Sequence, residues 1–172
     1  MEATGNGQAL DTRDETVIDL LDRHLATAVD LQLRIKQLLW NAEDPQITET
    51  WWLCNAAREF EMFGELIAER LRLLGTVAQA TPQNVQTRSI LDPAPTATDD
   101  QERLSAILRG LDQLHGFARQ ASENATAIRD EATANLFARL ATRINTQIWF
   151  LGAPPRRREI SQGNHHRSKA LA

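Results

Sequence analysis

The sequence predicts an all-α protein, a bundle of four long helices with one long crossover between the second and the third. Apolar residues recur at intervals of three and four over four long segments. Ala and Leu are the commonest apolar residues and Tyr is absent, which favours helices over strands. Three prolines gather between the second and third segments. With 172 residues, of which 42% are hydrophobic, the chain can bury the core of one domain.

The first helix is expected over residues 14–40 and the second over 47–74. Pro45 closes the connection between them, and Gly75 follows the second helix as a C-terminal cap. The side chains expected in the core from the first helix are Val17, Leu21, Leu25, Ala28, Leu31, Ile35 and Leu38. Phe63, Met62 and Cys54 of the second helix are also expected to be buried.

The third helix is expected to begin near Asp99 and to end near Ser122. Asp99 and Glu102 have the spacing of a capping box, in which each side chain bonds to the backbone near the other. The fourth helix is expected from about residue 127 to Gly152, with Asp130 and Glu131 suiting the positive end of its dipole. The core positions of these two helices are Leu104, Ile107, Leu108, Leu111, Leu114, Leu136, Leu140, Ile144, Ile148 and Leu151.

Residues 76–98 form the crossover, with a short helix expected over 83–90. The segment is too long for a tight helical hairpin, and it has the length that lets two antiparallel hairpins pair. We divide the chain into a disordered tail over 1–13, the bundle over 14–152, and a flexible basic tail over 153–172.

Charge is unevenly distributed along the chain. The C-terminal tail contains five basic residues and one acidic residue, a net charge of +4, whereas the whole chain carries −4. The rest of the chain is therefore acidic, and a polyanion such as DNA is expected to bind the tail without sequence preference. The candidate DNA-binding residues are Arg156, Arg157, Arg158, Arg167 and Lys169.

Three short runs carry a resemblance to a known family. Residues 36–41, Lys-Gln-Leu-Leu-Trp-Asn, are similar to the Lys-Gln-x-His-Trp-Asn run of the Dps family. Residues 65–70, followed by Leu-Gly at 74–75, resemble its Asp-x-x-Ala-Glu-Arg run and terminal Leu-Gly. Residues 148–151, Ile-Trp-Phe-Leu, resemble its Leu-Trp-Phe-Leu/Ile run. The resemblance extends over residues 16–151 and implies a ferritin-like bundle, the fold of the DNA-protecting miniferritins.

The resemblance implies a function as well as a fold. Dps proteins assemble as homo-oligomeric shells of twelve subunits, oxidise Fe(II), usually with hydrogen peroxide, and store the iron inside. Many bind DNA through basic tails. An oligomeric shell for iron storage and DNA protection under stress, located in the cytoplasm and at the nucleoid, is therefore the function that we expect.

The iron-oxidising site implied by the resemblance is incomplete in this sequence. In the family, two histidines of one subunit face an aspartate and a glutamate of another. The acidic pair corresponds to Glu65 and Glu69, the candidate metal ligands for iron. The histidine positions correspond to Leu39 and to Thr50 or Trp51, none of which offers an imidazole. Catalytic residues therefore stay unassigned, and whether the protein is an enzyme stays open.

Simpler interpretations exist for each of these residues. Glu65 and Glu69 are also consistent with solvated side chains, Glu69 pairing with Arg70 or Arg72. His24 and His115 have no ligand at metal-binding spacing, so we expect surface or hydrogen-bonded positions for them. Large aromatic residues are most simply core or subunit-interface residues, and here these are Trp40, Trp51, Trp52 and Trp149.

Two other functions are alternatives to a storage shell whose metal site lacks the family's histidines. One is an active ferroxidase or peroxide-consuming cage that uses Glu65 and Glu69 with unidentified ligands. The other is a metal-free relative that co-assembles with a complete Dps subunit. No apolar stretch approaches the ~20 residues of a membrane span, so no membrane partner is expected. The single cysteine is consistent with a reducing cytoplasm.

Overall fold

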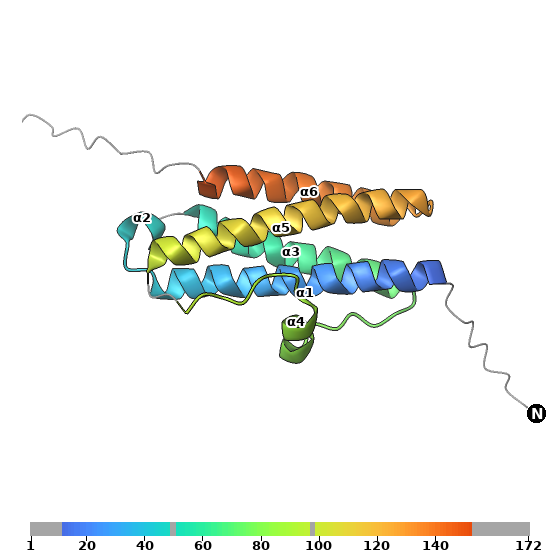
Figure 1. Ribbon diagram of the computed structural model, residues 1–172, viewed down its shortest axis with the longest axis horizontal. Coiled ribbons are helices and arrows are strands. Elements are labelled where there is room, and N and C mark those ends of the chain that lie inside the picture. Colours follow the sequence, from blue (N-terminus) through green and yellow to red (C-terminus); the bar gives the residue numbers. More distant parts are fainter. Residues whose placement is uncertain (1–11, 49–50, 97–98, 153–172) are drawn as a thin grey trace, which may run out of the picture.

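A computed structural model describes residues 12–48, 51–96 and 99–152. These ranges contain six helices and no strand (Figure 1). The long helices are α1 (Thr12–Asn41), α3 (Trp51–Leu73), α5 (Asp100–Ala127) and α6 (Glu131–Gly152); the short ones are α2 (Pro45–Thr48) and α4 (Pro82–Arg88). Helix α1 begins two residues before the predicted boundary at 13/14. The remaining parts of the predicted tails, 1–11 and 153–172, lie outside the described residues.

The four long helices pair as two antiparallel hairpins. Helix α1 packs along α3, and α5 packs along α6, while further contacts join α1 to α5 and α3 to α6. The segment from α3 to α5 runs the length of the bundle and presses α4 against α1 (Figure 1). The predicted four-helix bundle with one long crossover is therefore confirmed, and α4 lies where a short helix was expected.

The core follows the predicted 3.6-residue period. All seven positions expected from α1 are buried, and the largest fully buried side chains include Phe60 of α3 and Phe137 of α6. Four of the ten positions expected from α5 and α6 are only half-buried, although all pack against the core. The prediction for Phe63 is confirmed.

Two apolar residues of α3 lie outside the core, contrary to the sequence-based expectation. Cys54 is exposed, and Met62 keeps 43% of its surface accessible. Successive helical residues are 100° apart, so Met62 faces the same way as Glu65 and Glu69, three and seven residues on. The carboxylates remain in solvent, and Met62 shares their face.

Two of the long helices, α3 and α5, are each followed by a residue in the left-handed conformation. Gly75 has φ of 80°, and the amides of Gly75 and Thr76 bond to the carbonyls of Arg72 and Leu71. This is the Schellman pattern, which satisfies the last carbonyls of a helix, so the predicted cap at Gly75 is confirmed. Arg129 takes the same position after α5, with φ of 64°.

The boundary between the third and fourth long helices lies further along the chain than predicted. Helix α5 continues to Ala127, five residues beyond the expected end, and α6 begins at Glu131. The turn is fixed by the amide of Asp130, which bonds to the carbonyl of Ala125. The Asp130 carboxylate then accepts the amide of Thr133 at 3.0 Å and caps α6.

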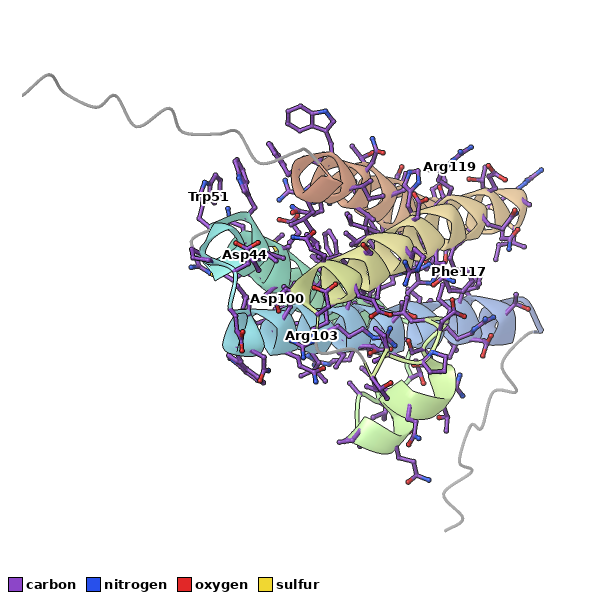
Figure 2. The ribbon with its side chains drawn as sticks, turned by 60° about the vertical axis from the view of Figure 1, so that its left-hand side comes forward. Asp44, Trp51, Asp100, Arg103, Phe117 and Arg119 are labelled. Carbon is purple, nitrogen blue, oxygen red and sulfur yellow. The ribbon has the colours of Figure 1, made fainter. Side chains whose placement is uncertain are left out.

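At the other end of the bundle, Asp99 caps α5 as predicted, accepting the amide of Gln101 at 3.1 Å. The next residue, Asp100, accepts the amides of Glu43 and Asp44 in the loop after α1, at 2.8 and 3.1 Å. These hydrogen bonds hold the pKa of the Asp100 carboxyl below its usual value. Figure 2 shows Asp44 and Asp100 together at this end.

The crossover is tied to α1 by polar contacts. Arg88 bonds to Asp19 at 3.0 Å, and the Ser89 hydroxyl donates to Asp30 at 2.7 Å. Further on, Leu91 lies over Gly110 of α5, where an added Cβ would come within 3.2 Å of the leucine side chain. None of the described helices is long and apolar enough to cross a membrane.

Candidate metal centre

The predicted metal ligands, Glu65 and Glu69, lie together on the solvent-facing side of α3. Both are exposed, and residues four apart on a helix have Cβ atoms about 6 Å from each other. Phe63, Ile67 and Leu71, on the opposite side of α3, are buried in the core and hold this helix in place. The two carboxylates can therefore approach one cation from the same side.

The acidic pair is not neutralised within the protomer. Among the described residues, no ion pair involves Glu65 or Glu69. The guanidinium of Arg70, proposed from sequence as a partner of Glu69, instead reaches Asp130 at 2.9 Å and Thr133 at 2.8 Å. The interpretation in which Arg70 pairs with Glu69 is therefore wrong.

Arg70, Asp130 and Thr133 form a network that joins the end of α3 to the start of α6. Thr133 accepts from Arg70 and donates to Asp130 at 2.6 Å. Partial burial opposes ionisation of Asp130, but hydrogen bonds from Thr133 and Arg70 outweigh it and lower the pKa of the carboxyl. The place of Asp130 at the start of the helix was predicted from the sequence, but its contact with Arg70 was not, because Arg70 lies 60 residues away and leaves no local signal.

The positions that correspond to the family's histidines offer no ligand within the described residues. Leu39 is half-buried and packs against the core. Trp51, the alternative second position, is 55% exposed and lies against Trp52 with ring centroids 3.7 Å apart. Thr50 lies outside the described residues.

His24 is inside the bundle and belongs to a different environment from Glu65. Its ring stacks on Phe117 of α5 at 4.0 Å and lies 4.3 Å from Phe137 of α6. Its Nδ1 atom is 2.6 Å from the carbonyl of Leu20, whereas Nε2 is buried without a hydrogen-bond partner. Burial lowers the pKa of His24 to about 4, so the imidazole is neutral at pH 7. His24 was expected at a surface or hydrogen-bonded position; it is buried, and of its two ring nitrogens Nδ1 alone has a hydrogen-bond partner.

One protomer therefore supplies two carboxylates and no completed site. The described residues contain no group of three or more His, Cys, Asp or Glu side chains that could together hold a metal ion. The donors fit a weakly held cation and do not fit the histidine-containing site of the family.

Aromatic side chains gather where α3 begins and α6 ends. Trp52 lies between Trp51 and Phe150, with the Phe150 ring stacked on it at 4.3 Å. Trp149 meets Phe150 edge to face, at 4.9 Å, and remains 66% exposed. Figure 2 shows Trp51 projecting away from the bundle at this end. Trp51 and Trp149 are therefore not core residues of the protomer, whereas Trp52 is half-buried and packs against the core.

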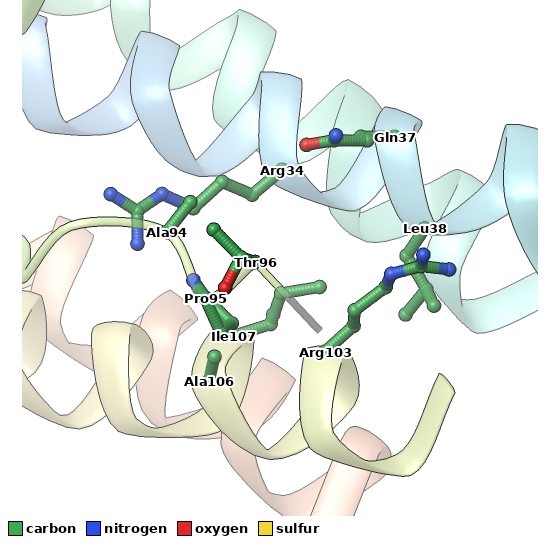
Figure 3. A pocket seen from close by; sticks show the side chains of 9 residues that line it. All are labelled: Arg34, Gln37, Leu38, Ala94, Pro95, Thr96, Arg103, Ala106 and Ile107. Carbon is green, nitrogen blue, oxygen red and sulfur yellow. The ribbon is translucent and has the colours of Figure 1, made fainter. Parts of the chain in front are cut away.

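A separate open cavity of about 240 Å³ lies between α1, α5 and the end of the crossover (Figure 3). Its two guanidinium groups already bond to carboxylates: Arg34 to Asp30 at 2.8 Å and Arg103 to Asp100 at 3.3 Å. The lining residues include no carboxylate, thiol or imidazole, and they are Arg34, Gln37, Leu38, Ala94, Pro95, Thr96, Arg103, Ala106 and Ile107. This cavity is therefore not a metal site.

Comparison with known proteins identifies the family. The model of the Ferritin-like domain matches residues 18–154. The DNA protection during starvation protein of Agrobacterium fabrum is 30% identical over 140 residues, covering 80% of this chain and 86% of that protein. The chain belongs to the Dps family of ferritin-like proteins.

Other Dps proteins agree in sequence and fold. DNA protection during starvation protein 1 of Deinococcus radiodurans is 28% identical over 144 residues, covering 81% of this chain and 68% of that protein. The structure of Dps from Thermosynechococcus elongatus superposes with a TM-score of 0.77 at 23% identity, over 82% of this chain and 90% of that one. The ferritin-like bundle predicted from the three sequence runs is thus confirmed.

Proposed function

We propose that this protein forms a Dps-type homo-oligomeric shell, of twelve subunits, that stores iron and protects DNA under stress. Membership of the family supports this role. The observation that carries it is the apolar surface left by one protomer: Trp40, Leu73 and Trp149 are each at least 66% exposed on well-packed helices. Exposed apolar side chains of this size are typical of surfaces covered by another subunit.

Assembly is tested on the metal-free, full-length protein. We expect light scattering after size exclusion to give a mass near twelve times 19.3 kDa with a chelator present. Assembly without metal is expected because the exposed aromatic surface supplies the contacts. A monomer at micromolar concentration would refute the proposed shell.

The iron-handling part of the proposal is storage without an autonomous oxidation site. Two exposed carboxylates can attract Fe(II) but supply no imidazole, so we derive no oxidation step from this chain's own residues. Fe(II) is added anaerobically to the metal-free shell, then oxygen or peroxide, and ferric absorbance is followed. We expect oxidation at the rate of buffer alone, followed by retention of the iron with the protein.

The alternative of an active ferroxidase has one observation in its favour, since Glu65 and Glu69 have no ion-pair partner among the described residues. Fast oxidation that is lost in Glu65→Gln and in Glu69→Gln would establish it. Fast oxidation only after a complete Dps subunit is mixed in would support the alternative of a mixed shell.

DNA protection is proposed to depend on the basic tail, whose arginines and lysine lie outside the described residues. Twelve copies of a segment with net charge +4 bind a polyanion far more tightly than one copy. Association with DNA in the cytoplasm, at the nucleoid, follows from this proposal. A chain ending at Pro155 should fail to retard duplex DNA at low salt while assembling normally. Equal retardation by both chains would exclude the tail.

A further inference from the structure

The open cavity between α1, α5 and the end of the crossover, which we call the crossover cavity, has a lining that suits a small organic acid. We propose that it binds a molecule with one carboxylate on a short apolar body, and that Arg34, Gln37 and Thr96 receive the carboxylate. The cavity lies within one protomer, so this binding does not depend on the proposed shell. It would add a ligand to a protein whose proposed function uses only iron and DNA.

The size and the apolar walls of the crossover cavity suit a small ligand. Its volume of about 240 Å³ is below the roughly 300–1,000 Å³ of pockets for drug-sized molecules, but several times the ~30 Å³ of one water molecule. Leu38 and Ile107, each 1% exposed, form its floor, and Pro95 and Ala106 are half-buried beside them. An apolar group that covers these side chains is withdrawn from water, which favours binding.

The polar side chains that line the crossover cavity can all donate hydrogen bonds. They are Arg34, Gln37, Thr96 and Arg103, and the lining includes no carboxylate. Figure 3 shows Arg34 and Arg103 extending toward opposite ends of the cavity, with Thr96 between them. Donors and positive charge around an apolar floor favour a ligand group that is negative and accepts hydrogen bonds.

Arg34 is held in place by one carboxylate and keeps a donor for another. Its Nε and Nη2 atoms donate to Asp30 at 2.8 and 3.0 Å, whereas Nη1 has no partner among the described residues. Asp30 also accepts the Ser89 hydroxyl at 2.7 Å, so its charge is shared between two donors. The Gln37 amide and the Thr96 hydroxyl also lack a hydrogen-bond partner within the part of the chain that the structure describes. These three side chains can therefore receive a carboxylate.

The carboxylates that already face the two guanidinium groups do not line the cavity. Asp100, which binds Arg103, also accepts the amides of Glu43 and Asp44, so its charge is spread over several donors. The ion pairs fix the guanidinium groups at the edge of the cavity and place no negative group inside it. An amine would be repelled there, and inorganic phosphate would leave the apolar floor uncovered, so a carboxylate with an apolar body fits best.

The ligand class is tested on full-length, metal-free protein with hexanoate as the probe. Saturation-transfer NMR detects the weak binding, and isothermal titration measures the Kd. We expect a Kd of about 1 mM, the order expected for so small a ligand. Hexan-1-ol has the same chain without the charge, and acetate has the charge without the chain. Each should bind at least about tenfold more weakly than hexanoate.

Two variants test whether hexanoate binds in the crossover cavity. Ala106→Leu fills part of the cavity without changing the charge, and Arg34→Gln removes a guanidinium. We expect each to weaken hexanoate binding about tenfold. Arg119→Gln is the matched control, because it removes the same charge from α5 about 24 Å from Arg103 along the helix (Figure 2). This control should bind hexanoate as the wild type does.

Circular dichroism measures whether each variant stays folded. If Arg34→Gln melts below the wild type because Asp30 has lost its partner, Ala106→Leu decides, since it breaks no ion pair. Binding of hexan-1-ol or acetate as tight as that of hexanoate would overturn the ligand class, and so would equally tight competition by inorganic phosphate. Undiminished binding by Ala106→Leu, an equal loss in Arg119→Gln, or a wild type that does not bind hexanoate would overturn the site.

Discussion

Replacing His24 tests how the interior of the bundle responds to acid. The ring is 1% exposed and lies between Phe117 and Phe137. Burial is the largest cause that lowers its pKa from 6.5 to about 4; the Leu20 carbonyl opposes this shift, and the charge on Arg23 adds to it. A protonated His24 would therefore be a poorly solvated charge inside the core.

The sign and size of the effect follow from proton linkage. The pKa is lower in the folded protein, so between pH 6.5 and 4 the unfolded chain binds more protons and stability falls as the pH falls. A shift of this size corresponds to about 3 kcal/mol lost by pH 4, of which about 2 kcal/mol is lost by pH 5. The pKa of the Asp130 carboxyl is lowered, so its contribution to stability is lost only as the pH falls below the ordinary pKa of aspartate. The pH range in which Asp130 titrates therefore lies below the range in which His24 affects stability.

His24→Leu removes the titrating group while keeping similar volume. At pH 7 we expect the free energy of unfolding to change by less than about 1.5 kcal/mol. Lowering the pH from 7 to 5 should destabilise the wild type by about 2 kcal/mol more than the variant. Urea unfolding at pH 7, 6 and 5, followed by circular dichroism at one protein concentration, measures this. His115→Leu, a half-buried position on α5, is the control. Parallel pH dependence of wild type and His24→Leu would refute the reasoning.

Three further predictions concern the ends of the helices. Arg70→Met should destabilise the protein by about 3 kcal/mol, because it leaves the Asp130 carboxylate partly buried without its guanidinium; denaturant unfolding at pH 7 measures it. Gly75→Ala should cost about 1 kcal/mol, since φ of 80° strains any side chain there. Arg129→Gly should do the reverse and raise the melting temperature, because it relieves the same strain at φ of 64°. A lower melting temperature for Arg129→Gly would contradict the assigned turn.

Much of the fold could be predicted because helical periodicity is a local property. The seven core positions of α1 recur at three and four residues and are all buried. The cap at Gly75 could be predicted because glycine is the residue that best tolerates a left-handed turn. The end of α5 could not, because there an arginine takes that conformation and no glycine marks the boundary.

The candidate site could be predicted only in part. Glu65 and Glu69 share a face because they are four residues apart, and the same rule would have placed Met62 in solvent beside them. Cys54 was assigned to the core by residue type alone, although it lies four residues before the exposed Arg58. Contacts such as Arg70 with Asp130 join residues 60 apart, so they depend on how the helices pack and not on local pattern.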